Sequence, residues 1–222
     1  MRVALLCSRR APGLPELLQA AGRAQDWRIV VGVTSNPESE APPRLHTADV
    51  PALTHDIVAF YRSRGQRWSD LAVRDAYDRV TVDLLRPFRP DLVVLCGYLH
   101  IVTPPLLAAY PSRIINIHDS DLTLTDAEGR PRYRGLRSTR DAIVAGEPET
   151  RSTVHLVTEA VDVGPPLLVS EAFPTHPPVG DLKAYAYAQR EWMMRASWGR
   201  LLAQAIARFA LGEVRMEEAR VA

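Results

Sequence analysis

Three polar residues, Asn116, His118 and Asp162, have the types and the spacing of a catalytic set. Asn116 and His118 end an apolar run at residues 114–118, and Asp162 follows a second run at residues 153–158. Asparagine can donate a hydrogen bond to an oxyanion, histidine can move the proton of an amine, and aspartate can orient and stabilise the histidine. This combination favours acyl transfer to an amine, without a covalent nucleophile.

The position of these residues in the chain favours a shared site. Asn116 and His118 are two apart, so they point to the same side of a regular strand. Polar side chains are costly inside a buried strand unless they emerge at the edge where ligands bind. Three hydrogen-bonded structural residues at strand ends are the alternative interpretation. Asp162 must reach the other two from a later loop.

The apolar runs belong to an alternating series of strands and helices. Short, β-rich runs without polar interruption are typical of buried parallel strands. We predict an α/β fold with a mostly parallel central sheet, helices on both faces and ligands bound beyond the C-terminal strand ends. The predicted strands span residues 2–7, 28–33, 92–98, 114–118, 153–158 and 167–170, and the predicted helices span 14–25, 68–85, 104–110, 139–145 and 181–212, the last as one or two helices.

Three other segments carry turn signals or mixed signals. Residues 34–48 are predicted to form a turn and a polar, proline-containing loop. Residues 56–61 fit either a strand or a helix. Residues 119–134 are polar and rich in turn formers around Asp126 and Gly129, which predicts a hairpin or an exposed flap.

The composition is ordinary for a soluble globular protein, with 46% hydrophobic and 24% charged residues among 222. We predict one domain over residues 1–222, with a frayed charged tail at about 213–222. A net charge of +1 provides no field that attracts nucleic acid or an anionic membrane. No leader or bilayer-spanning run is recognised, so the cytoplasm is the expected location. Cys7 and Cys96 lie in apolar runs outside any metal-binding motif and are predicted to be buried and reduced.

Several linked motifs follow one another along nearly the whole chain: Pro90 to Tyr98, Asn116-Ile117-His118, Arg134-Gly135-Leu136, Ser152 to His155 and Val157 to Pro165. Together they resemble the motifs of the folate-dependent formyltransferases, and most closely those of the glycinamide ribonucleotide formyltransferases. The resemblance implies a Rossmann-like formyltransferase fold and 10-formyltetrahydrofolate as the co-substrate. No residue pattern indicates a metal site, so no metal is expected.

The resemblance also implies a role for individual residues. Asn116 corresponds to the oxyanion donor, His118 to the proton-transfer group and Asp162 to its partner. A pterin pocket is expected beside the strand that ends at Gly97, formed largely by backbone groups. Its implied residues are Tyr98, Leu99, His100, Ile101, Val102, Thr158, Val161 and Gly164.

The part that would bind the amine acceptor departs from the family pattern. Family members carry a Gly/Ser/Asn-rich loop for the substrate phosphate, whereas this chain has Ser8-Arg9-Arg10-Ala11-Pro12-Gly13. Proline removes an amide donor, and Arg9 and Arg10 offer guanidinium groups that can hold a phosphate or a carboxylate instead. After His118 this chain carries Asp119, where the family has proline. Such a carboxylate can bind a cationic substrate or stabilise a charged His118, or it can simply hold the flap.

Further candidates for acceptor binding are Arg134, in the arginine-rich flap at 123–137, and Glu191, which matches an acidic position near the ribose hydroxyls in relatives. The flap is interpreted either as a clamp for an anion or as a hairpin exposed to solvent. Arg9 and Arg10 are interpreted either as ligands of the acceptor or as exposed loop residues. His155, inside a strand-like run, is assigned a structural or supporting role.

The expected reaction is formyl transfer to a primary amine of a small molecule, glycinamide ribonucleotide or a related anionic amine, by a monomer or homodimer. Two alternatives stay open. Water can replace the amine, which gives a 10-formyltetrahydrofolate hydrolase. The altered acceptor region can also mark a folate-binding relative without turnover.

Overall fold

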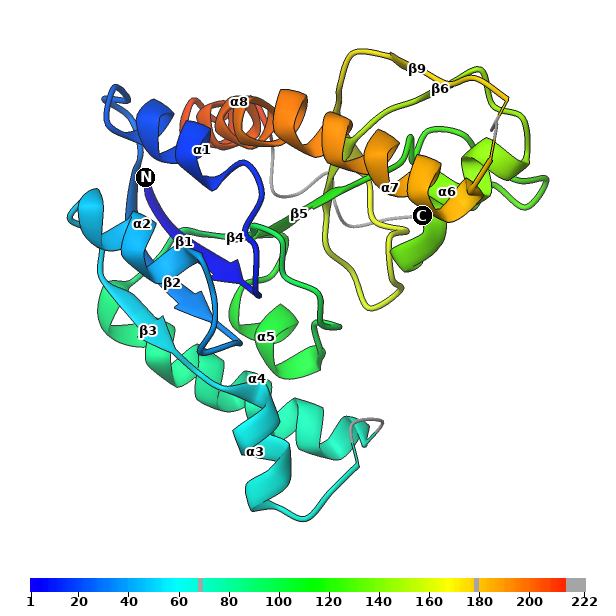
Figure 1. Cartoon of the computed structure of the whole chain (residues 1–222). Helices are drawn as coiled ribbons and strands as arrows, with labels where there is room; N and C mark the ends of the chain where they lie inside the picture. Colours follow the sequence, from blue (N-terminus) through cyan, green and yellow to red (C-terminus); the bar gives the residue numbers. More distant parts are fainter. Residues whose placement is uncertain (68–69, 178–179, 215–222) are drawn as a thin grey trace.

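A seven-stranded sheet forms the centre of the protein (Figure 1). The computed structural model describes residues 1–67, 70–177 and 180–214. The strand order is β3-β2-β1-β4-β5-β7-β8. The first five of these are parallel, whereas β7 runs antiparallel to β5 and β8 antiparallel to β7. The strands are β1 Arg2–Cys7, β2 Arg28–Thr34, β3 Ala52–Thr54, β4 Leu92–Leu95, β5 Ile114–His118, β7 Thr153–Leu156 and β8 Pro166–Val169.

Helices cover both faces of the sheet, as predicted. The helix pair α1 and α8 packs on one face, and α4 and α5 pack together on the other (Figure 1). The helices are α1 Leu14–Ala21, α2 Ala41–Thr47, α3 Ile57–Ser63, α4 Leu71–Leu85, α5 Pro104–Ala109, α6 Ser138–Val144, α7 Leu182–Met193 and α8 Gly199–Ala210.

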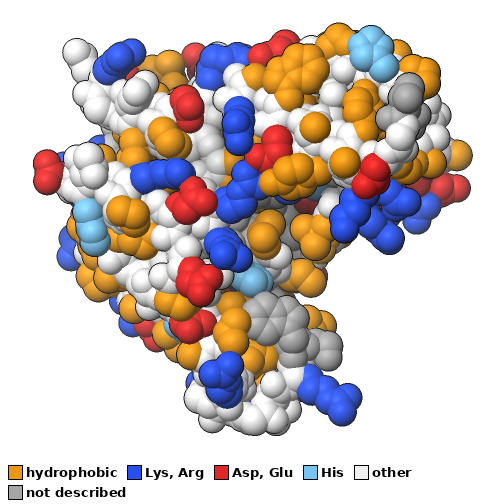
Figure 2. Space-filling model, viewed as in Figure 1, with side chains coloured by type: hydrophobic (Ala, Val, Ile, Leu, Met, Phe, Trp, Pro, Cys, Tyr) orange, Lys and Arg blue, Asp and Glu red, His pale blue; other side chains and the backbone are white. Residues whose placement is uncertain are grey.

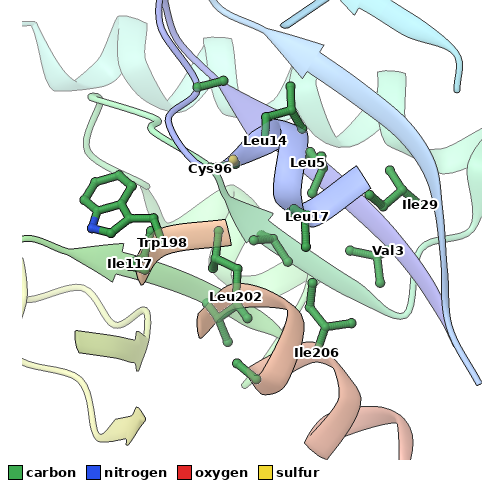
Figure 3. Packing of buried hydrophobic residues seen from close by; sticks show 14 of the residues in the cluster. Val3, Leu5, Leu14, Leu17, Ile29, Cys96, Ile117, Trp198, Leu202 and Ile206 are labelled. Carbon is green, nitrogen blue, oxygen red and sulfur yellow. The ribbon is translucent and has the colours of Figure 1, made fainter. Parts of the chain in front are cut away.

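The alternation of side chains along β1 supplies both cores. Successive residues of a strand point to opposite faces. Val3, Leu5 and Cys7 therefore join the core under α1 and α8, while Ala4 and Leu6 join the core under α4 and α5. Figure 3 shows the first core, to which α1 contributes Leu14 and Leu17 and α8 contributes Leu202 and Ile206. Because β1 is buried on both faces, its sequence is apolar throughout.

The prediction of a loop over residues 34–48 is wrong for its second half, where α2 forms. Prolines at its first turn fix a helical φ where the backbone N–H groups need no helical partner. Ala41 and Leu45 then bury one side of this helix. The ambiguous segment at 56–61 is helical: the Asp56 carboxylate accepts hydrogen bonds from the N–H groups of Val58 and Ala59, and so caps α3.

Short elements and several element ends also differ from prediction. Helix α1 ends at Ala21 rather than at residue 25, and β4 ends at Leu95 rather than at residue 98. The three-residue β3 and the two-stranded sheet of β6 (Glu149–Thr150) and β9 (Phe173–Pro174) were not predicted. They are too short to give a periodic pattern. The helix predicted from residue 68 is seen from Leu71, and residues 68–69 lie outside the described part of the chain.

The segment predicted as one or two helices over 181–212 forms two α-helices that continue into each other through a π-helical turn. A π-helical turn at Met194–Trp198 joins α7 to α8. Of the predicted frayed tail, the Glu213 N–H still bonds to the Arg208 carbonyl at 2.9 Å, and residues 215–222 lie outside the described residues. Both cysteines are buried and free, as predicted. Within the described ranges, no helix is long and apolar enough to cross a membrane.

The strand order places a switch point between β1 and β4. The chain moves outward from β1 through β2 to β3, then returns to form β4 on the other side of β1. Helices that follow β1 and β4 consequently leave on opposite faces, which opens a crevice beyond the C-terminal ends of these strands. The end of β5, with Asn116 and His118, lies beside this crevice.

Candidate active site

A cavity of about 650 Å³ opens beyond the C-terminal ends of β4 and β5. Figure 2 shows a hollow in the surface between the part that carries α3 and the part that carries α6 and α7. Most of the cavity wall is apolar, and a few polar side chains converge on it, which is the usual make-up of a small-molecule site. Its polar lining includes Arg74, His100, Asn116, His118, Asp119, His155, Asp162 and Arg190.

Strand β5 brings Asn116 and His118 to the same cavity. The strand pairs with β4 on one side and β7 on the other without a register shift, so the two side chains share a face. His118 is buried, and Asn116 is partly exposed. Opposite Asn116 on β7 stands His155.

The loop after β7 carries Asp162 to His118. Asp162 is buried and has a φ of 55°, in the left-handed region that aspartate tolerates better than most residues. Its Oδ2 lies 3.5 Å from His118 Nδ1 and accepts a hydrogen bond of 2.8 Å from the Gly135 N–H. This second bond ties the end of the 123–137 flap to the same carboxylate.

Two carboxylates lie near one ring nitrogen of His118, and no described residue bonds to the other ring nitrogen. Its Nδ1 lies 3.5 Å from Asp162 Oδ2 and 3.8 Å from Asp119 Oδ1. Its Nε2 is buried and makes no hydrogen bond with any described residue. A buried ring nitrogen without a partner is costly in the resting protein, so it marks the atom that is available to exchange a proton with a bound molecule.

His155 fixes the orientation of Asn116. Burial lowers the pKa of His155 to about 4, so the ring is neutral near pH 7. Its Nδ1 lies 2.8 Å from the Leu156 carbonyl, which only accepts, so Nδ1 carries the proton. The Nε2 lone pair is then left to accept from Asn116 Nδ2 at 3.1 Å. Nδ2 keeps one N–H for another acceptor.

The cavity wall contains seven of the eight residues predicted for the co-substrate pocket. Tyr98 and Val102 are buried in it, and the exposed side chains of Leu99, Ile101 and Val161 form its rim. The predicted residues that line the cavity are Tyr98, Leu99, His100, Ile101, Val102, Thr158 and Val161.

Gly164, the eighth, is not among the lining residues. A Cβ atom at this position would lie 1.8 Å from the Leu156 carbonyl oxygen, so only glycine lets the loop pack against β7. Gly97, at the end of β4, is similarly confined: its φ is 69°, and a Cβ there would lie 2.7 Å from Pro12 Cδ. The β1–α1 loop therefore packs directly on the turn that follows β4.

A buried arginine that sequence reasoning missed, Arg74, lines the far end of the cavity. Its Nε donates to the Ile101 carbonyl at 2.8 Å, and its Nη2 contacts Tyr98 Oη at 2.8 Å and Asp78 Oδ1 at 2.9 Å. Its buried Nη1 has no hydrogen-bond partner among the described residues. Burial raises the pKa of Asp78, and the charge of Arg74 opposes that rise. The Arg74/Asp78 spacing of four was the only sequence signal for this pair.

The residues predicted for acceptor binding are divided by the structure. Asp119 is buried and lines the cavity, whereas Arg9, Arg10, Arg134 and Glu191 are not among its lining residues. Arg10 and Glu191 pair with each other through two hydrogen bonds, of 2.6 and 2.5 Å. These bonds lower the pKa of Glu191 and raise that of Arg10. Arg9 is exposed and lies 3.4 Å from Glu38, and Arg134 is exposed.

The predicted flap is a small hairpin closed by a bridge between Thr125 and Pro131. Two of its arginines are paired with neighbouring carboxylates. Arg130 contacts Asp126 and Glu128, and Arg132 contacts Glu147 at 3.1 Å. These contacts favour the solvated hairpin over the anion clamp.

Comparisons with known proteins identify the family. A family model described as formyl transferase matches residues 1–177. The chain belongs to this formyl transferase family. The phosphoribosylglycinamide formyltransferase of Escherichia coli K12 is 30% identical over 168 residues, which cover 76% of this chain and 71% of the relative. That of Mycobacterium tuberculosis H37Rv is 32% identical over 165 residues, 74% of this chain and 67% of the relative.

A solved structure shares the fold of this formyl transferase. Glycinamide ribonucleotide transformylase 1 from Symbiobacterium toebii superposes with a TM-score of 0.77 at 30% identity, over 96% of this chain and 88% of that one. The predicted fold class and the resemblance to glycinamide ribonucleotide formyltransferases are thereby confirmed.

The family match covers the predicted catalytic residues but not the last two long helices. Asn116, His118 and Asp162 lie within the matched residues 1–177. Helix α7, which carries Arg190 and Glu191, lies beyond them. In the described part of the chain, no cluster of three or more His, Cys, Asp or Glu side chains has the arrangement of a metal site.

Proposed function

We propose that this formyl transferase moves the formyl group of 10-formyltetrahydrofolate to the primary amine of a small anionic acceptor, with glycinamide ribonucleotide as the reference acceptor. The observation that carries the proposal is the meeting of Asn116, His118 and Asp162 at one cavity. Each has a free hydrogen-bonding capacity or a neighbour suited to the reaction.

The make-up of the cavity supports a folate co-substrate. Its apolar wall between Leu95 and Val102 suits a flat ring system, and the surrounding backbone supplies polar groups. The unpartnered Nη1 of Arg74, at the far end, suits an anionic or carbonyl group of an elongated ligand. When bound, 10-formyltetrahydrofolate supplies the carbonyl carbon that an amine attacks.

We assign the chemical roles from the hydrogen-bonding capacity of each side chain. The free N–H of Asn116 Nδ2 donates to the formyl oxygen as negative charge develops there. His118 Nε2 accepts the proton that leaves the attacking amine and returns a proton to the folate nitrogen as the bond between that nitrogen and the formyl carbon breaks, which releases tetrahydrofolate. Asp162 faces Nδ1 on the other side of the ring and stabilises the imidazolium that results. His155 acts as a positioning residue, because it holds the Asn116 amide.

The acceptor is proposed to approach from the side of Asp119 and α7. Arg10 and Glu191 join the β1–α1 loop to α7 on this side. Arg9 and Arg134 stay predictions as acceptor ligands, as do a cytoplasmic location and a monomeric or homodimeric state.

The test is product analysis with the purified protein, 10-formyltetrahydrofolate and glycinamide ribonucleotide. Mass spectrometry is expected to show formylated acceptor in equal amount to tetrahydrofolate, with little formate. Formate released in equal amount to tetrahydrofolate, with no formylated amine from a broad acceptor panel, would establish the hydrolase instead. Folate binding without turnover of any kind would establish the non-catalytic alternative.

A further inference from the structure

Arg190 of α7 lines the cavity, and only one edge of its guanidinium group is hydrogen-bonded to a described residue. The side chain is 27% exposed and belongs to the cavity lining. Its Nε donates to Asp119 Oδ2, and within residues 1–67, 70–177 and 180–214 this is the one hydrogen bond of its guanidinium. Both Nη groups therefore keep their N–H donors, in the forked arrangement that matches two oxygens of a carboxylate or phosphate.

Asp119 holds Arg190 beside the reacting histidine. Asp119 is buried, and its Oδ2 also accepts from Thr139 Oγ1 at 3.1 Å, while its Oδ1 lies 3.4 Å from Ser138 Oγ. The same Oδ1 is 3.8 Å from His118 Nδ1. A single carboxylate thus separates the arginine from His118, so whatever the arginine binds lies close to the proton-transfer group.

Two nearby arginines are more fully engaged within the protein. Arg10, which does not line the cavity, uses both Nη groups on the Glu191 carboxylate. Arg74 is buried and uses its Nε and Nη2 on Ile101, Tyr98 and Asp78, so that only its Nη1 lacks a partner among the described residues. If Arg190 served only to neutralise Asp119, a two-pronged pair like that of Arg10 would be the stronger arrangement. The observed contact uses Nε alone, so the two Nη groups are left to bind another group.

We infer that Arg190 binds an anionic group, carboxylate or phosphate, of the amine acceptor, and that Asp119 is the positioning residue that aims it. The inference rests on the proposed function for the identity of the acceptor as an amine. It assigns acceptor recognition to a helix outside the matched family segment, rather than to Arg9 or Arg134. Acceptors that carry an anion are therefore expected to be preferred over neutral amines of similar size.

The first experiment combines Arg190→Met with removal of the anion from the acceptor. Glycinamide ribonucleotide and its dephosphorylated ribonucleoside are compared as substrates for both proteins. The substitution is expected to raise KM for the ribonucleotide by about 10- to 100-fold, leave KM for the ribonucleoside within about twofold, and leave KM for the folate unchanged. Arg190→Lys, which keeps the charge but not the fork, is expected to recover part of the loss.

Two further arms make the result decisive. Arg200→Met removes an arginine that pairs with Glu171 away from the cavity, and it is expected to change neither KM. Asp119→Asn is expected to raise KM for the ribonucleotide more than for the ribonucleoside, because Arg190 loses its anchor. An equal effect of Arg190→Met on both acceptors, or none on either, would overturn the inference.

Binding of inorganic phosphate tests Arg190 without any turnover. Calorimetry on the wild-type protein is expected to give a Kd for phosphate that rises at least about 10-fold in Arg190→Met and stays unchanged in Arg200→Met. The same Kd in all three proteins would overturn the inference. If no amine is formylated but phosphate binding still depends on Arg190, the proposed function fails while the anion site stands.

Discussion

The two sides of the cavity are built differently. On the side of β4, β5 and β7, the polar groups that line the cavity are held by burial and by hydrogen bonds to backbone and side-chain groups, and His100 and His155 have pKa values lowered to about 4, mainly by burial. On the side of the β1–α1 loop and α7, the groups are joined by ion pairs, Arg10 with Glu191 and Arg190 with Asp119. The first side is proposed to transfer the formyl group and the second to choose the acceptor.

This difference between the two sides suggests how the acceptor can change in such an enzyme while the transfer chemistry stays the same. Buried neutral groups with fixed tautomers are sensitive to any change around them, because a lost partner leaves an unsatisfied polar atom. Ion pairs with exposed partners contribute little to stability, commonly about 0–1 kcal/mol. Arg9 and Arg10 depart from the family pattern and are exposed, so they can be exchanged with little harm to the fold. Asp119, which also departs from it, is buried and lies 3.8 Å from His118, so its exchange is expected to affect the site.

A large effect on turnover is expected from Asn116→Ala. Loss of an oxyanion donor lowers kcat by about 100- to 1,000-fold, while folate affinity changes little. Rapid-quench kinetics with saturating substrates measures this. Asn36→Ala, at a half-buried position in the loop after β2 that does not line the cavity, is the control and should keep wild-type kcat. A kcat within threefold of wild type in Asn116→Ala would contradict the transfer role of this side.

Gly164→Ala tests whether the Asp162 loop depends on close packing. The added methyl group would collide with the Leu156 carbonyl, so the free energy of unfolding should fall by about 1–3 kcal/mol. Urea unfolding measures the change. Gly22→Ala is the control, because its Cβ would meet backbone oxygens at ordinary distances of 3.6 Å and more. Equal stability of the two variants would show that the loop adapts.

Acid should lower the free energy of unfolding, because the buried histidines on the transfer side must take up protons. The pKa of His155 is lowered from 6.5 to about 4 in the folded protein, so between these values the unfolded chain binds more protons. Stability consequently falls as pH drops from about 6.5 to 4, by at most about 1.4 kcal/mol per pH unit for each such histidine. His155→Gln should flatten this slope in urea unfolding at several pH values. An unchanged slope would contradict a neutral His155.

The smallest effect is expected on the acceptor side, from Arg10→Met. The Arg10 side chain is 43% exposed, so its pair with Glu191 is weakened by solvent, and the free energy of unfolding should change by less than about 1 kcal/mol. KM for the folate should stay unchanged. A loss of stability as large as that of Gly164→Ala would show that this side is as rigid as the other.

Much of the fold could be predicted because it depends on local patterns. The apolar runs of β1, β2, β4 and β5 are continuous, since both faces of the sheet are covered. Helix α2 was missed because proline, which usually marks a loop, is also favourable in the first turn of a helix. Short edge elements such as β3 have no period to detect.

The candidate site divides in the same way. Asn116, His118 and Asp162 were selected from their residue types near strand ends together with the resemblance to the folate-dependent formyltransferases. Arg10 and Glu191 were both selected as ligands, yet they are 181 residues apart, and nothing in the sequence shows that they bind each other. Arg190 was missed for the same reason, because its anchor Asp119 is 71 residues away. Which side chains are left unpaired is decided only by tertiary packing.

The most direct test of the account is the His118→Ala variant, with turnover and folate affinity measured on the same preparation. Removing the proton-transfer group should lower kcat by about 100- to 10,000-fold, while the Kd for 10-formyltetrahydrofolate stays within about threefold. Turnover equal to the wild type would contradict a transfer side centred on His118.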